Sequence, residues 1–269
     1  MNNIMDKKNI IKASNIILEN RINKTEISKL PKDCEPKNYE ESYAIQDELT
    51  KSFISIKDNS IIGKKIGCTN KEAQKQLDIN TPFYGNLYSK FSNKNNCILK
   101  SSNFTNPYFE PEFSFKINQD INIYKAPFNI NEINSFIKCV IASVEIVDFR
   151  FKGNMKKIGI HNLISTNGAS EYWISGKKEI KLESIDLNNQ AVEVFVNDKL
   201  IEIGNSSNVL NNPIYSLQWL INELSKKNQP VLNKYIISTG TCTPAIKLNK
   251  NDKIKIDFKN IEIIEFQYI

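Results

Sequence analysis

The distribution of apolar residues divides the chain into a helical first part and a longer part dominated by strands. Up to about residue 60, isoleucine, leucine and aromatic residues recur at the spacing of amphipathic helices, on both sides of a break at Pro31–Pro36. From about residue 97 onward, short runs alternate apolar and polar residues with the period of two that is typical of strands. The pattern predicts a helical N-terminal region, 1–60, followed by a β-rich domain, 61–269.

Several individual elements follow from local signals. Thr69-Asn-Lys-Glu72 has the spacing of a capping box and predicts a short helix after a strand at 61–67, and Asn80–Gly85 is typical of a turn. Residues 112–117 alternate between aromatic or aliphatic and polar side chains, which predicts a half-buried strand. The remaining predicted elements are a strand at 140–147, a hairpin at 192–203 around Asn197-Asp198, a helix that begins at Pro213, and strands at 235–238, 253–258 and 261–268.

Composition and charge narrow the class of protein. The 269 residues are 40% hydrophobic and 25% charged, as in ordinary globular proteins, and no apolar run approaches the roughly 18 residues of a membrane span or forms a signal peptide. The net charge of +6 comes from scattered lysines, because only Arg21 and Arg150 are arginines. We therefore expect neither membrane insertion nor nucleic-acid binding.

The cysteines and the histidine restrict the possible chemistry. The five cysteines are dispersed and odd in number, which favours reduced thiols and a cytoplasmic location. His161 is the only histidine, so a metal site built from three histidines is excluded. Catalysis in this chain is expected to depend on carboxylates, lysine and a hard metal ion.

Three glutamates are candidate metal ligands. Glu110 and Glu112 are two residues apart and would share one strand face, where two carboxylates repel unless a cation or a proton lies between them. Glu145 interrupts an apolar run and should need a partner if it is buried. Three carboxylates on adjacent strands would suit Mg²⁺ or Mn²⁺. The alternatives are a solvated strand face for the first pair and a salt bridge to Arg150 for Glu145.

Two neighbouring lysines are flanked by glycines in the predicted strand at 61–67. Alternation would turn Lys64 and Lys65 to opposite faces, so that one of them points inward. An inward lysine beside a divalent metal could hold a substrate carboxylate or donate a proton. The alternative is that both are ordinary surface lysines.

These residues, taken in order, carry a family resemblance. The chain resembles the 2-keto-4-pentenoate hydratase / 2-oxo-3-hexenedioate decarboxylase group of the fumarylacetoacetate hydrolase superfamily, from about residue 10 to the C-terminus. The matching segments are Gly63-x-Lys65-Ile-Gly-x-Thr69, Pro82-x-Tyr-Gly85, Phe109-Glu-Pro-Glu-Phe113, Val144-Glu-Ile-Val-Asp-x-Arg150, Asn167, Gly204, Val209-Leu-x-x-Pro213 and Ser238-Thr-Gly-Thr241.

The resemblance implies a fold, a site and a class of reaction. The fold would be α+β, with a mixed β-barrel or roll as the catalytic domain after a small helical region, usually in homo-oligomers. By similarity, the three glutamates hold Mg²⁺ or Mn²⁺ and Lys65 is the catalytic residue. Lys65, Phe83 and Thr241 would contact the substrate, a small unsaturated 2-oxo acid from aromatic compound catabolism.

The sequence also departs from the family pattern. Phe83 occupies a position where the hydratases usually carry an aspartate and the decarboxylases an apolar residue, and Ser165-Thr-Asn-Gly168 lacks a second family aspartate. His161 could replace one missing acid/base group, although a core or surface histidine is favoured. Three interpretations stay open. A hydratase-type lyase is narrowly favoured, followed by a decarboxylase of the same fold and by a non-catalytic subunit that binds a small acid or helps a partner.

Overall fold

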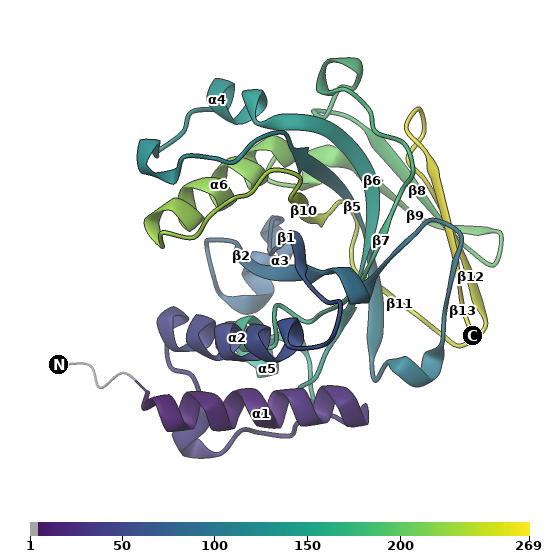
Figure 1. Ribbon diagram of the computed structural model, residues 1–269. Helices are drawn as coiled ribbons and strands as arrows, with labels where there is room; N and C mark the ends of the chain where they lie inside the picture. The colour runs from purple at the N-terminus through teal and green to yellow at the C-terminus, as the bar shows by residue number, and fades with distance from the viewer. Residues whose placement is uncertain (1–4) are drawn as a thin grey trace.

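Two β-sheets, of eight and five strands, form the centre of the computed structural model, which describes residues 5–269. Helices α1, α2 and α5 form one group, and α4 and α6 form another on the far side of β1 and β2 (Figure 1). The helices are α1 (Lys7–Asn23), α2 (Tyr39–Ile54), α3 (Lys71–Leu77), α4 (Ile130–Ser135), α5 (Met155–Ser165) and α6 (Pro213–Lys226). The strands are β1 (Ile61–Gly67), β2 (Phe83–Tyr88), β3 (Ser92–Lys94), β4 (Cys97–Leu99), β5 (Pro107–Ile117), β6 (Ile137–Asp148), β7 (Ser170–Ser175), β8 (Ala191–Val196), β9 (Lys199–Asn205), β10 (Ile236–Thr241), β11 (Ile246–Lys247), β12 (Asp252–Asp257) and β13 (Ile263–Tyr268).

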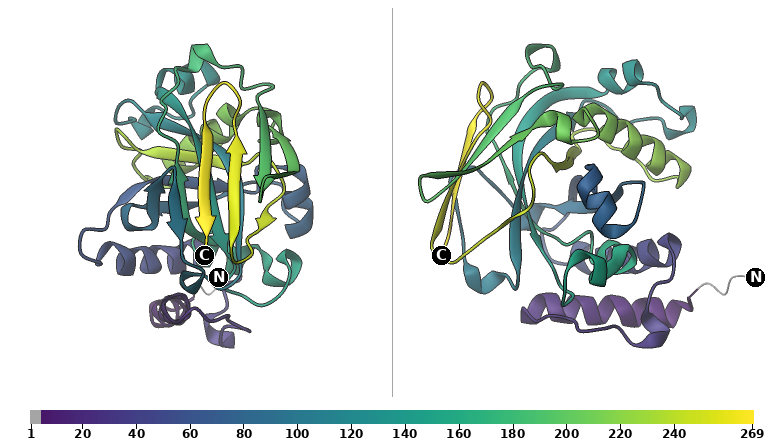
Figure 2. Two further views of the ribbon diagram at one scale, coloured as in Figure 1. Left: turned by 90° about the vertical axis from the view of Figure 1, so that its right-hand side faces the viewer. Right: turned by 180° about the vertical axis from the view of Figure 1, so that it is seen from behind.

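The order of strands brings distant parts of the sequence together. The larger sheet has the order β2-β1-β10-β5-β6-β7-β3, with β11 added to β5. The smaller sheet has the order β4-β13-β12-β8-β9, and β12 and β13 are in front after a 90° turn of the molecule (Figure 2). No pairing within residues 5–269 joins β2 to β3, so the larger sheet is not a closed barrel. The predicted α+β fold is confirmed.

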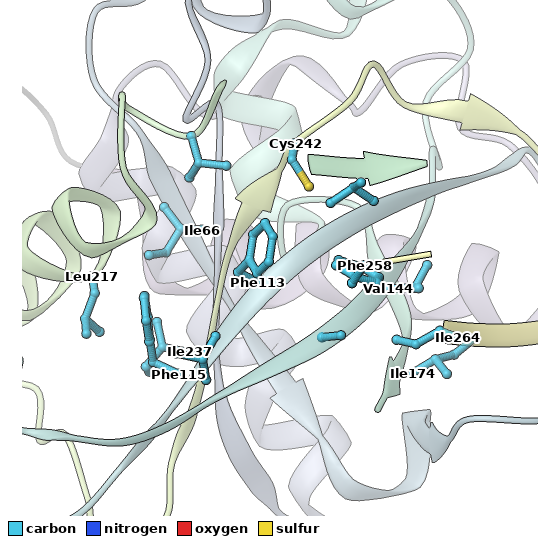
Figure 3. Packing of buried hydrophobic residues seen from close by; sticks show 14 of the residues in the cluster. Ile66, Phe113, Phe115, Val144, Ile174, Leu217, Ile237, Cys242, Phe258 and Ile264 are labelled. Carbon is cyan, nitrogen blue, oxygen red and sulfur yellow. The ribbon is translucent and has the colours of Figure 1, made fainter. Parts of the chain in front are cut away.

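The long strands β5 and β6 have an apolar face and a polar face. Phe113 and Phe115 of β5 and Val144 of β6 belong to the main core, which also contains side chains of α6 and of the smaller sheet. Figure 3 shows Leu217 of α6 beside Phe115, with Phe258 close to Val144. The intervening residues point to the other face, because successive side chains alternate.

A second apolar cluster covers that other face. It is built by α1, α2 and α5 together with Phe83 and Val147. The strand at 112–117 is therefore buried along both faces, and the prediction of a half-buried strand is wrong. Glu112 and Ser114 lie beneath this second layer instead of facing solvent. The division of the chain near residue 60 stays a prediction, since the N-terminal helices pack against later elements in this cluster.

Two details of the predictions near β1 and β2 are wrong. The predicted short helix is confirmed as α3, but it begins after Asn70, whose side chain accepts a hydrogen bond from the Ala73 N–H, so Thr69 is not the cap. The expected turn at 80–85 ends early because Phe83 opens β2 and pairs with Gly67 of β1. Strand pairing outweighs the local preference of Gly85, which lies opposite Lys65.

The predicted hairpin turn and the predicted start of a helix at Pro213 are confirmed. Asn197 and Asp198 both adopt positive φ angles, 52° and 65°, between β8 and β9, as a two-residue hairpin turn requires. Pro213 is at the start of α6 after the capping residue Asn212. The five cysteines are free and buried in the part of the chain that the structure describes. Among the described helices, none is both long and apolar enough to cross a membrane.

Candidate functional site

Three glutamates from β5 and β6 converge on the polar face of the larger sheet. Glu110 and Glu112 are two residues apart on β5, and Glu110 lies directly opposite Glu145 in the antiparallel register. One carboxylate oxygen from each of the three lies within 4.8 Å of the others. The sequence spacing placed the first pair on one face, and the pairing of β5 with β6 adds the third carboxylate.

These carboxylates are poorly paired for their burial. Glu112 and Glu145 are 0% exposed. Ser238 of β10 donates a hydrogen bond to Oε2 of Glu112. Within residues 5–269, the other Glu112 oxygen and both Glu145 oxygens have no hydrogen-bond partner. Buried anionic oxygens without donors are costly, so this arrangement favours a bound cation.

Lys65 is the basic group that faces the three carboxylates. Its side chain is 2% exposed, and its Nζ lies 3.1 Å from Oε2 of Glu145. The contact is an ion pair by distance, although it lacks the direction of a hydrogen bond. Burial alone would lower the pKa of Lys65, but the neighbouring carboxylates outweigh it and the pKa is raised. The amine is therefore an ammonium at neutral pH.

Burial and neighbouring carboxylates also raise the pKa values of Glu110 and Glu112. Burial and the proximity of Glu145 raise the pKa of Glu110 to about 7, against the opposite effect of Lys65. Burial, Glu145 and Glu110 together raise the pKa of Glu112 well above its usual range. One ammonium does not balance three carboxylates. An oxygen-rich, negatively charged site of this kind fits Mg²⁺ or Mn²⁺, and water would complete its coordination.

The alternatives left open by the sequence are wrong for these residues. Glu110 and Glu112 do not form a solvated strand face, because Glu112 is fully buried and Glu110 is only partly exposed. Glu145 does not pair with Arg150, whose guanidinium contacts Asp148 and Glu171 instead. Lys64 is buried too, on the opposite face of β1, where its Nζ donates to Oδ1 of Asn86 at 2.7 Å.

Two cavities meet at Glu110. The outer one has a volume of about 840 Å³ and is lined by residues that include Glu110, Tyr108 and Met155. A smaller inner cavity of about 60 Å³ is lined by Lys65, Phe83 and mostly apolar neighbours. Glu110 lines both. A small acid in the outer cavity would lie beside Glu110, and the inner cavity connects Glu110 with Lys65.

Phe83 forms part of the wall beside Lys65. It is 3% exposed, and the Lys65 Nζ lies 5.3 Å from the centre of its ring. Gly67 and Gly168 leave room for the ring, because a Cβ at either position would overlap it. This packing keeps water away from the inner end of the site.

The remaining sequence candidates have different surroundings. Thr241 lines both cavities, but its hydroxyl donates to the Thr243 carbonyl at 2.8 Å. Asn167 binds the backbone of Asn86 on β2 through both ends of its amide. His161 contacts Ser42 and Tyr39 of α2 and is not among the described lining residues of either cavity. The hypothesis that His161 supplies the missing acid/base group is therefore not supported.

Ser238 is a site residue whose role the sequence did not reveal. It belongs to β10, which lies between β1 and β5, and it pairs with both Lys65 and Ser114 in register. Ser238 and Glu112 are 126 residues apart in the sequence, so no local sequence pattern could predict their contact. The contact arises from the antiparallel pairing of β10 with β5.

Comparison with known proteins gives relatives along the whole chain. 4-Oxalocrotonate decarboxylase of Pseudomonas putida is 24% identical over 274 residues, covering 100% of both chains. 2-Keto-4-pentenoate hydratase 1 of Dechloromonas aromatica is 23% identical and covers 82% of each chain. 2-Oxo-hept-4-ene-1,7-dioate hydratase of Escherichia coli is 25% identical and covers 86% of each. No profile of a known protein family matches the chain.

Solved structures share the fold. The structure of 4-oxalocrotonate decarboxylase from Pseudomonas putida G7, complexed with magnesium and adipate, superposes with a TM-score of 0.93, 24% identity and full coverage of both chains. Fumarylpyruvate hydrolase from Pseudomonas aeruginosa, in complex with Mn²⁺ and pyruvate, has a TM-score of 0.59 at 8% identity, covering 77% of this chain and 88% of the other. The chain is therefore similar in sequence to 4-oxalocrotonate decarboxylase and to 2-keto-4-pentenoate hydratases, and it has the fold of the fumarylacetoacetate hydrolase superfamily.

Proposed function

We propose that this protein is a lyase that uses a divalent metal ion, Mg²⁺ or Mn²⁺, to act on small unsaturated 2-oxo acids. The observation that carries the proposal is a group of three carboxylates, two of them fully buried with unpaired oxygens, in contact with a buried lysine that lines the inner cavity. The named activities of the relatives, decarboxylase and hydratase, and the magnesium and Mn²⁺ complexes of related folds support it.

The roles of the residues follow from their surroundings. Glu110, Glu112 and Glu145 would hold the metal ion through the oxygens that converge on one point. When bound, the ion supplies a Lewis acid that stabilises negative charge on the carbonyl oxygen of a 2-oxo acid. Lys65 is the catalytic residue in this proposal. Its ammonium Nζ attracts the substrate carboxylate and can deliver a proton to the reacting carbon chain.

Two reactions fit this site, and Phe83 bears on the choice. The sequence alone narrowly favours hydration, and the hydratase relatives support it. The packing of Phe83 beside Lys65 favours decarboxylation, because a phenyl ring excludes water and cannot orient it for addition. 4-Oxalocrotonate decarboxylase of Pseudomonas putida aligns with the full chain. We therefore place decarboxylation first and hydration second, with Phe83 as a residue that contacts the substrate chain.

A non-catalytic role in small-acid binding or as a helper subunit is the third possibility. The retention of Lys65 together with all three glutamates favours catalysis instead. The proposal also includes a homo-oligomeric assembly and a cytoplasmic location, the latter supported by five free cysteines. Thr241 stays a proposed substrate contact through its place in the walls of both cavities.

The test offers two substrates to the purified protein. 2-Keto-4-pentenoate and 4-oxalocrotonate are each incubated with Mg²⁺ while loss of the dienol absorbance and release of CO₂ are followed together. We expect turnover that stops when the metal is chelated and returns when Mn²⁺ is added. Binding of Mn²⁺ without turnover of either acid would instead support the helper subunit.

Phe83 provides a test of the reaction type. Replacement with aspartate should raise the ratio of hydration to decarboxylation on 4-oxalocrotonate, measured by NMR of the products with Mg²⁺ present. Phe83→Leu is the matched control, because it changes the shape of the wall while keeping it apolar. If Phe83→Asp leaves the ratio unchanged and the parent protein is already a fast hydratase, Phe83 has only a packing role.

A further inference from the structure

Thr69 has a buried hydroxyl that the fold itself does not use. The residue is 1% exposed, and its Oγ1 has no hydrogen-bond partner within residues 5–269. Its backbone is fixed, because the Thr69 carbonyl accepts a hydrogen bond from the Leu210 N–H at 2.8 Å. A buried hydroxyl without a partner destabilises the folded protein. Stability therefore does not explain this hydroxyl, and a role in ligand binding would.

The surrounding backbone makes room for this hydroxyl. Cys68, just before it, has a positive φ of 57°, which turns the chain at the end of β1. Gly240, with a φ of 101°, lies across from it, and a Cβ at position 240 would overlap Oγ1 of Thr69. The cap of α3 is supplied by Asn70, so the Thr69 side chain is not needed to begin that helix.

Thr69 lies where the two cavities meet. Thr69 lines the outer cavity together with Glu110 and Thr241, and the same three residues line the inner cavity that contains Lys65. Thr241 differs from Thr69 in one respect. Its hydroxyl already donates to the Thr243 carbonyl, at 2.8 Å, and accepts from the Thr243 N–H, at 3.2 Å.

We propose that the Thr69 hydroxyl donates a hydrogen bond to an oxygen of the 2-oxo acid, and that it does so more strongly than the hydroxyl of Thr241. This inference rests on the proposed function. The carboxylate and the carbonyl of a 2-oxo acid only accept hydrogen bonds. Ionised glutamates also only accept, so they cannot donate to the substrate. Lys65 and Thr69 are side-chain donors at the inner end of the site, and together they match the substrate's acceptors.

The test is binding of 2-oxopentanoate, a saturated 2-oxo acid that cannot turn over, measured by calorimetry with saturating Mg²⁺. Thr69→Val keeps the shape and removes the hydroxyl, and it should weaken binding about tenfold. Thr69→Ser keeps the donor and should restore most of the affinity. Thr241→Val should weaken binding less than Thr69→Val does. The affinity of Thr69→Val for Mn²⁺ alone should equal that of the parent.

Thermal unfolding without ligand separates binding from a structural role. Thr69→Val should unfold at the same or a higher temperature than the parent, because it removes an unsatisfied group, whereas Thr241→Val should unfold at a lower one. If Thr69→Val binds 2-oxopentanoate as tightly as the parent, or unfolds earlier, this inference is overturned while the proposed function stands. If the parent with Mg²⁺ does not bind 2-oxopentanoate, the proposed function itself fails.

Discussion

Two clusters of buried charged side chains both include a residue of β6, Glu145 in one and Asp148 in the other. They differ in how completely their charges are paired. One, the carboxylate site, consists of Glu110, Glu112, Glu145 and Lys65. The other, the arginine network, consists of Asp148, Arg150, Arg21 and Glu171. Both include side chains that are almost wholly removed from solvent, so burial does not distinguish them.

The arginine network is internally satisfied. The Arg150 Nη2 lies 2.6 Å from Glu171 and 2.9 Å from Asp148, and Nε of Arg21 lies 3.0 Å from Glu171. Asp148 also accepts hydrogen bonds from the Thr105 and Asn106 N–H groups. The network ties α1 to β6 and β7, and it uses both arginines of the chain.

The carboxylate site has three acids and one base, and its oxygens include three with no hydrogen-bond partner among the described residues. A buried ion pair with complete hydrogen bonding can be purely structural, whereas unbalanced buried charge is typical of functional sites. The completeness of charge pairing, and not burial, therefore distinguishes a structural network from a candidate binding site.

The largest expected effect is the loss of metal binding in Glu145→Gln. This change keeps the volume and removes one anionic ligand, so Mn²⁺ affinity should fall on the order of 100-fold or more, and turnover should fall with it. Calorimetry with Mn²⁺ measures the affinity. Glu171→Gln, the same change in the arginine network, is the matched control and should bind Mn²⁺ like the parent. Parent-like Mn²⁺ affinity in Glu145→Gln would rule out the metal site.

For the free energy of unfolding, the arginine network should be the more sensitive of the two clusters. Glu171→Gln leaves two buried guanidinium groups underpaired and should lower the free energy of unfolding by about 3 kcal/mol. Glu112→Gln removes one of three repelling carboxylates and should leave the metal-free protein equally or more stable. Urea unfolding in the presence of a chelator measures both. Equal destabilisation by the two changes would contradict the comparison.

The two lysines of β1 should differ in catalysis. Lys65→Met removes the ammonium that contacts Glu145 and should lower kcat/KM about 100-fold. Lys64→Met removes a side chain that contacts Asn86 on the other face of the sheet, and kcat/KM should stay within about threefold of the parent. Steady-state kinetics with Mg²⁺ give both values. The reverse order of effects would mean that Lys64, not Lys65, serves the site.

The smallest expected effect is a pH dependence of stability that comes from Lys64. Burial lowers the pKa of its amine from 10.5 to about 8, so between these values the unfolded chain binds more protons than the folded one, and the parent gains stability as pH rises. Lys64→Met lacks this gain. The difference between the unfolding free energies of the two proteins should therefore change in favour of the parent from pH 8 to pH 10. A constant difference would show that burial does not lower the pKa of Lys64.

Much of the fold and part of the site can be predicted from local sequence. The hairpin turn at Asn197-Asp198 and the start of α6 at Pro213 depend on the backbone preferences of those residues. The common direction of Glu110 and Glu112 depends only on the alternation of a strand. Glu145 is a candidate because it interrupts an apolar run, and Lys65 because strand alternation turns one of two lysines inward. The resemblance supports both, and the geometry brings them together with the first two, while their roles stay proposals.

The remaining features depend on contacts between residues far apart in the chain. The buried polar face of β5, the choice of Lys65 over Arg150 as partner of Glu145, and the contact of Ser238 with Glu112 all arise from strand order and from the layer of helices above it. Local sequence determines which way a side chain points along its own strand. It does not determine what lies opposite, because that depends on which strands pair and on which surfaces they bury together.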